Sequence, residues 1–131
     1  MSWVAVLAGF LVAHMVGDYL FQTDWQARHK RGGLTGGGVA RRALVAHVTT
    51  YTLAFLPAFI WIGTELDVAW ALAAAVLVFV PHLLIDDGRG VAFYLVRVKG
   101  VEEFNLSLAA SVDQTFHVLS LFLVALMLGA A

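Results

Sequence analysis

The sequence has no cysteine and only two prolines, and charged residues make up 13% of its 131 positions. Without cysteine there are no disulfides and no thiolate ligands, so any metal site must use histidine, carboxylate or amide groups. Such ligands favour Zn, Mn, Fe or Mg over Cu(I) or iron–sulfur clusters. The formal net charge is −1, and the chain lacks the basic stripe of nucleic-acid-binding proteins, so we expect no nucleic-acid partner.

Apolar residues are abundant instead: 61% of the chain is hydrophobic, and the mean hydropathy is +0.86. This composition is too apolar for a water-soluble domain of this length. It predicts one all-α transmembrane domain over residues 1–131, folded as an integral membrane four-helix bundle. Segments of roughly 20 apolar residues are long enough to cross a bilayer, and the sequence contains four, at about 3–21, 44–62, 68–85 and 106–128.

Three irregularities are expected around these spans. The first helix should continue beyond Phe21, because residues 23–28 also favour a helix. Pro57 should kink the second span, because proline removes a backbone donor inside a helix. The run at 91–96, within the connection 88–105, is too short to cross a membrane and is expected to form a short interfacial or re-entrant segment between helices three and four.

The charges predict the orientation. All eight Lys and Arg residues fall in the first and third connections, whereas the second connection carries only Glu65 and Asp67. Because short cytoplasmic loops carry an excess of Lys and Arg, both basic connections should be cytoplasmic and both termini outside. We expect Arg41 and Arg42, at the start of the second span, to contact anionic lipid head groups.

Histidine and aspartate recur at four-residue spacing inside these apolar segments. Residues four apart lie on one face of a helix, and ionisable groups inside a membrane segment face partners in the bundle interior. The predicted topology brings these groups to a similar depth near the cytoplasmic face. They are His14, Asp18 and Gln22 on the first span, His47 on the second, His82 and Asp86 on the third, and Asp113, Gln114 and His117 on the fourth.

Imidazole and carboxylate groups that converge from facing helices are typical of a divalent metal site. We expect the metal ligands to be His14, Asp18, His82, Asp86, Asp113 and His117. The expected catalytic residues are His47, as a further ligand or as the general acid/base, and Asp18. The two amides, Gln22 and Gln114, are expected to bind a ligand or the substrate through hydrogen bonds. One or two metals are compatible with this number of ligands.

Three other interpretations remain open. The same layer of residues suits a proton or cation pathway. Paired histidines on facing helices can also hold a b-type haem, although aspartate beside each pair makes the layer polar for a porphyrin. The third is a structural cluster of hydrogen-bonded polar groups.

The motifs H-x3-D-x3-Q from His14 to Gln22, the lone His47, H-x3-D from His82 to Asp86, and D-Q-x2-H from Asp113 to His117 resemble those of a domain-of-unknown-function family of small bacterial and phage membrane proteins. The resemblance covers most of the chain and implies a four-helix, multi-pass protein of the bacterial cytoplasmic (inner) membrane. The pattern is more distantly similar to that of membrane-bound metal-dependent hydrolases regulated with the DNA-damage response.

The expected function is a membrane-embedded, metal-dependent hydrolase that acts on a phosphoester or ester of a lipid or membrane-associated substrate. A divalent Zn, Mn or Fe would be its cofactor, and membrane lipids its partners. The alternative is a non-enzymatic cation- or proton-binding or transport subunit that uses the same His/Asp layer. The small bundle, with frequent Gly and Ala, is also compatible with a homodimer.

Overall fold

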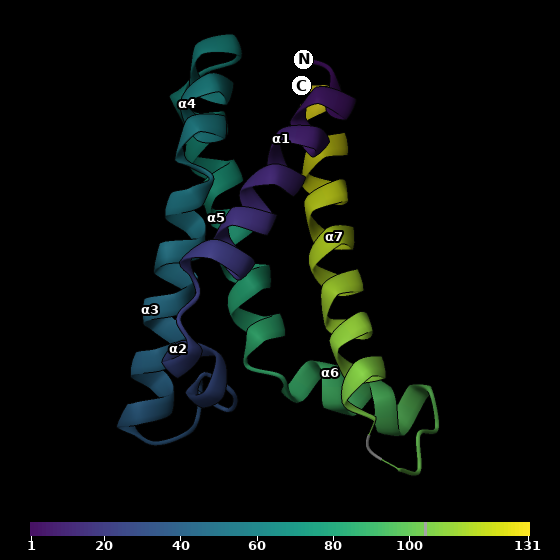
Figure 1. The fold of residues 1–131 in the computed structure, drawn as a ribbon. Coiled ribbons are helices and arrows are strands. Elements are labelled where there is room, and N and C mark those ends of the chain that lie inside the picture. Colours follow the sequence, from purple (N-terminus) through teal and green to yellow (C-terminus); the bar gives the residue numbers. More distant parts are fainter. Residues whose placement is uncertain (104) are drawn as a thin grey trace.

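The computed structural model describes residues 1–103 and 105–131, and all of its regular elements in those residues are helical (Figure 1). This confirms the all-α prediction. In chain order the elements are α1 (Trp3–Met15), the π-helix η1 (Val16–Phe21), α2 (Asp24–His29), α3 (Gly38–Ala54), α4 (Leu56–Glu65), α5 (Val68–Asp86), α6 (Arg89–Phe93), the π-helix η2 (Tyr94–Val98) and α7 (Leu106–Ala130).

Three helical segments are long and apolar enough to cross a membrane: Trp3–Phe21, Val68–Asp86 and Leu106–Ala130. A fourth crossing is available if α3 and α4, which meet at an angle of 48°, form one bent span. The two termini lie together at one end of the bundle, and the short helices α2 and α6 lie at the other (Figure 1). The protein is therefore helical, with three or four segments suited to a bilayer.

The second span bends where the sequence predicts. The chain leaves α3 at Phe55, whose amide bonds to the carbonyl of Thr52 in a tighter i→i+3 turn. Pro57 then occupies the first turn of α4, where a missing amide hydrogen costs no helical hydrogen bond. The expectation of a kink at Pro57 is confirmed.

The expectation that the first helix continues past Phe21 is wrong. Gln22 is extended, and Thr23 starts the separate helix α2 with a capping box. Thr23 Oγ1 accepts from the Gln26 amide at 3.2 Å, and Gln26 Oε1 accepts from the Thr23 amide at 2.9 Å. This reciprocal pair satisfies two amides that a helix start leaves free, so a new helix begins where a continuous one was expected.

The first span changes its helical geometry at the depth of the polar residues. After Met15 the backbone widens into the π-helix η1, and the amide of Gln22 bonds to the carbonyl of Gly17 five residues earlier. Gly17 packs directly against Tyr51 of α3, so that a Cβ atom there would lie 2.6 Å from the tyrosine Cδ2. The close approach of these two helices therefore depends on glycine at position 17.

Apolar side chains fill the bundle on the side of the termini. Buried residues of α1, α3, α4, α5 and α7 form the main cluster, which includes Phe10, Phe55, Ile62, Val78 and Leu121. A second, smaller cluster joins α6, η2 and α7 around Val91, Leu95 and Ala109. The buried polar residues belong to neither cluster.

The first connection is fixed to the end of α5. The backbone carbonyl of Asp87 accepts a hydrogen bond from the Gly32 amide at 2.8 Å. The Asp87 carboxylate accepts one from the Leu34 amide at 2.9 Å. Arg89 pairs with the same carboxylate and donates to Thr35 Oγ1 at 2.9 Å. These contacts hold the segment after α2 against the polar end of the bundle.

We predict that Gly17→Ala destabilises the protein by about 1–3 kcal/mol, the usual cost of overpacking a close contact. The added methyl group would overlap the ring of Tyr51 and would lie only 3.2 Å from the Tyr51 Cα atom. Because the Cα atom belongs to the backbone, a rotamer change of Tyr51 cannot relieve this contact. Thermal unfolding of the detergent-purified protein measures the effect. The matched control is Gly9→Ala on the same helix, where a Cβ meets nothing within 4 Å; equal unfolding temperatures for both variants would contradict the prediction.

Candidate metal centre

Four helices each contribute one buried histidine to a single layer. His14 comes from α1, His47 from α3, His82 from α5 and His117 from α7, and none of them is more than 2% exposed. The rings contact one another: the centroids of His47 and His82 lie 5.1 Å apart, and those of His82 and His117 lie 4.4 Å apart. The predicted convergence of histidines from four helices is therefore present in the structure.

Two histidines and two aspartates make the tightest group of possible ligand atoms. His47 Nε2 lies 3.3 Å from Asp18 Oδ1 and 2.8 Å from Asp86 Oδ2. His82 Nε2 lies 3.6 Å from Asp18 Oδ1 and 3.1 Å from Asp86 Oδ2. The two Nε2 atoms are 3.1 Å apart. Metal–ligand bonds of about 2.0–2.2 Å place neighbouring donor atoms roughly 2.8–3.6 Å apart in octahedral or tetrahedral sites, so these five distances are compatible with donor atoms around one cation.

The hydrogen bonds of this group also suit a cation. Asp18 Oδ1 is buried and forms no hydrogen bond within the described residues, although two imidazole nitrogens lie nearby. His117 Nε2 is likewise buried without a hydrogen-bond partner there. Buried polar atoms are normally satisfied, and the exceptions concentrate at functional sites. A divalent cation would satisfy donor atoms that hydrogen bonding leaves unused.

Asp86 joins this group to a second one. The second group consists of His82, Asp86 and His117, whose ligand atoms all lie within 4.8 Å of one another. Asp86 Oδ2 faces His47 and His82, whereas Oδ1 lies 3.6 Å from His117 Nε2. The carboxylate of Asp86, which is 2% exposed, thus has one oxygen directed at each group.

His14 lies beside these groups. Its Nδ1 is 3.1 Å from Tyr51 Oη and 3.4 Å from Asp18 Oδ2, and its Nε2 is 3.0 Å from Gln114 Oε1. Both ring nitrogens therefore have neighbours outside the two donor groups. This position suits a residue that orients Asp18 and Gln114.

The other predicted site residues surround the layer. Gln22 Nε2 lies 3.0 Å from His47 Nε2. On α7, the His117 Nδ1 atom lies 3.0 Å from the carbonyl of Asp113 and 3.4 Å from its carboxylate. Together with the pairing of Gln114 and His14, these contacts bring every predicted site residue to one region of the bundle.

Tyr51 is a site residue that the sequence reasoning missed. Its ring stacks on His82 with a centroid separation of 3.4 Å and an interplanar angle of 10°. Nδ1 of both His47 and His82 has no hydrogen-bond partner within the described residues, whereas metal-bound imidazoles usually have one. Packing therefore orients the ring of His82. The position of Tyr51, four residues after His47 on one helix face, was a usable signal.

Lys30 is the second missed residue. Its Nζ donates to Asp86 Oδ2 at 2.8 Å, and the lysine side chain is 15% exposed. Lys30 follows α2 directly, and the contact exists because the connection folds back onto the end of α5. No spacing pattern links residues 30 and 86, so the sequence held no signal for this pair.

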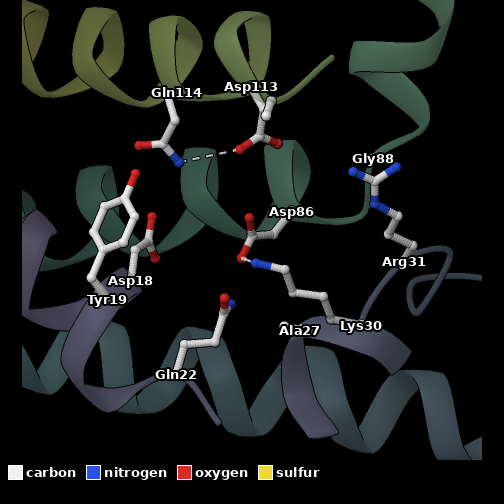
Figure 2. Close-up of a pocket in the computed structure, with 11 residues that line it drawn as sticks. Asp18, Tyr19, Gln22, Ala27, Lys30, Arg31, Asp86, Gly88, Asp113 and Gln114 are labelled. Atoms are coloured by element: carbon white, nitrogen blue, oxygen red, sulfur yellow. Dashed lines mark hydrogen bonds and ion pairs between the residues drawn. The ribbon is translucent and has the colours of Figure 1, made fainter. Parts of the chain in front are cut away.

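A polar cavity of about 230 Å³ adjoins the cluster and shares Asp18 and Asp86 with it. Figure 2 shows Asp113 and Gln114 entering the cavity from α7, with Lys30 directed at Asp86 from the opposite side. The lining residues are Asp18, Tyr19, Gln22, Ala27, Lys30, Arg31, Asp86, Gly88, Ala110, Asp113 and Gln114. The two shared carboxylates would connect a bound cation to a space for a small molecule.

The fold and this site define an all-helical protein with membrane-length helices and a buried His/Asp cluster suited to a metal. The chain belongs to the family described as protein of unknown function (DUF3307), whose family model matches residues 6–131. The predicted resemblance to a family of unknown function is thereby confirmed. No curated protein and no solved structure matches the chain.

We predict that the purified protein binds a divalent metal and that His82→Ala removes it. His82 belongs to both donor groups, and losing a ligand should weaken binding by more than the 10–100-fold typical of an outer-shell partner. Elemental analysis of protein loaded with Zn, Mn or Fe measures the metal content. The control is His29→Ala, whose exposed ring lies 2.8 Å from the Trp25 carbonyl and stacks on the Trp25 ring; equal metal content in the two variants would contradict the assignment.

Proposed function

We propose that this protein is a membrane-embedded, metal-dependent hydrolase whose site opens through the polar cavity. The observation that supports the proposal most strongly is the group formed by Asp18, His47, His82 and Asp86, with contacts of 2.8–3.6 Å. Two of these residues also line the adjoining cavity. A catalytic metal site needs both protein ligands and an open position facing the substrate.

The proposed arrangement in the membrane has four crossings, with α3 and α4 as one bent span. Lys and Arg occur only in the two connections at the α2 and α6 end, so the positive-inside rule orients that end toward the cytoplasm. Both termini would then lie outside a bacterial inner membrane. Arg41 and Arg42, both exposed in the first turn of α3, would contact anionic lipid head groups.

The proposed reaction is hydrolysis of a phosphoester or ester. The oxygen of a water molecule bonds to phosphorus or to the carbonyl carbon, and the bond from that atom to the ester oxygen breaks. The leaving ester oxygen takes up the proton that the water gives up. A divalent metal supplies the activation of water and the polarisation of the attacked group. The crowded position of His47 Nε2 favours a ligand role over that of a general base. Asp113, whose side chain reaches the cavity, is placed to exchange a proton with the leaving group.

Two alternatives use the same residues. A transport subunit would need a polar path toward the end with the termini, but that half of the bundle is packed with residues such as Phe10, Phe55 and Leu121. A haem would need a slot between histidine rings, but these rings contact one another. The hydrolase proposal agrees better with both observations.

We predict metal-dependent turnover of a chromogenic phosphoester or carboxylic ester. Chelation should abolish it, and Asp86→Asn should lower kcat/KM at least about 100-fold, because the Asp86 carboxylate lies within 3.6 Å of the Nε2 atoms of His47, His82 and His117. The matched control is Asp24→Asn, whose carboxylate is 75% exposed and pairs with Arg28. Metal-loaded protein that conducts cations in proteoliposomes but hydrolyses none of the esters would favour the transport alternative instead.

We predict that the connection between α2 and α3 is cytoplasmic and that the turn after α4 lies outside. The cysteine-free sequence allows single substitutions to report this directly. Thr64→Cys, at an exposed site in the last turn of α4, should react with an impermeant maleimide on intact cells. Gly37→Cys, where a Cβ meets nothing within 4 Å, should react only after lysis. The opposite labelling pattern would show that the orientation is reversed.

A further inference from the structure

Two basic side chains line the cavity beside the His/Asp cluster. Lys30 approaches from the side opposite α7 and contacts Asp86 directly, whereas the side chain of Arg31 runs beside Gly88 (Figure 2). Lys30 pairs with Asp86 at 2.8 Å, and a divalent cation bound to the same carboxylate would compete with this ion pair. An ammonium group displaced from Asp86 would be free to contact a ligand that carries negative charge.

Backbone contacts position the segment that carries both residues, and Arg31 itself is exposed. The capping box positions α2 and the two residues after it, and the Gly32 amide bonds to the Asp87 carbonyl at 2.8 Å. The aliphatic part of Arg31 packs on Gly88, where a Cβ would lie 3.5 Å from Arg31 Cγ. Within the described residues no carboxylate pairs with the Arg31 guanidinium, so this group can contact a ligand.

The charge of the cavity depends on the metal. Three carboxylates against one lysine and one arginine leave a net negative charge, which repels anions. A single divalent cation on Asp18 and Asp86 makes the net charge positive. It would also weaken the 2.8 Å pair between Asp86 and Lys30 and release the ammonium group. Anion binding should therefore require the metal.

Two apolar grooves on the outer surface of the helices each share one lining residue with this cavity. Tyr19 lines both the cavity and a groove of about 410 Å³ along α1 and η1. Gln114 lines both the cavity and a groove of about 430 Å³ on α7, which continues over Val118, Leu119 and Phe122. A molecule with a polar head and apolar chains could occupy the cavity and a groove together.

We propose that the cavity binds the phosphate of a phospholipid, with Lys30 and Arg31 as its cationic contacts and the acyl chains in the adjoining grooves. Lysine and arginine are the common protein partners of phosphate. The cavity is smaller than the roughly 300–1,000 Å³ of most ligand pockets, which suits a small head group. This inference rests on the proposed function, because the metal is what makes the cavity receptive to an anion.

The test is calorimetric binding of dihexanoyl phosphatidic acid to the detergent-purified protein, with and without bound Zn. We expect binding only to the metal-loaded form, weakened about 10-fold or more in Lys30→Gln and in Arg31→Gln, since hydrogen bonds to charged groups are the stronger ones. The matched control is Arg28→Gln on α2, whose side chain is 72% exposed and does not line the cavity. It should bind like the wild type.

Glycerol 3-phosphate and inorganic phosphate, measured in parallel, distinguish a lipid from a free phosphate. Both should bind at least 10-fold more weakly than the lipid, and Leu119→Gln should weaken only the lipid. Equal affinity for all three ligands would overturn the lipid assignment. Metal-loaded protein that binds none of them would overturn this inference but not the metal site. Protein that takes up no metal would overturn both.

Discussion

The structure depends on burying the carboxylate of Asp86 in an apolar helical bundle. An ionised carboxylate removed from water is costly unless positive or hydrogen-bonding groups surround it. Here His47, His82 and Lys30 contact one oxygen of Asp86 at 2.8–3.1 Å, and His117 lies near the other. Groups from α3, α5, α7 and the segment after α2 therefore meet at a single side chain, and a divalent cation there would stabilise the arrangement further.

Backbone features support this convergence from outside the layer. The π-helix η1 and the close packing of Gly17 on Tyr51 bring Asp18 to the centre of the bundle. Tyr51 in turn stacks on His82 and contacts His14. Asp87 holds the first connection against α5, which positions Lys30. The candidate site is thus built from packed helices rather than from loops alone, which gives it the rigidity that ligand geometry requires.

Hydropathy predicted the long helices, and the four-residue His/Asp spacing predicted which faces meet, because both signals follow directly from helix geometry. The break at Gln22 escaped prediction because a capping box outweighed good helical propensity. Spacing also identifies a helix face but not the direction in which a ring nitrogen points. It could therefore not show that His14 turns toward Tyr51 and Gln114, whereas His82 belongs to both donor groups. Lys30 reaches Asp86 only through the folded connection, which no periodic pattern encodes.

The most direct test of this account is X-ray absorption spectroscopy at the metal edge of protein loaded with one equivalent of Zn. A cation bound by Asp18, His47, His82 and Asp86 should show a first shell of two imidazole nitrogens and carboxylate oxygens at about 2.0–2.2 Å, with the imidazole signal reduced in His82→Ala and retained in His14→Ala. A first shell of oxygen alone, or a spectrum unchanged by His82→Ala, would show that the four-helix His/Asp layer does not bind metal.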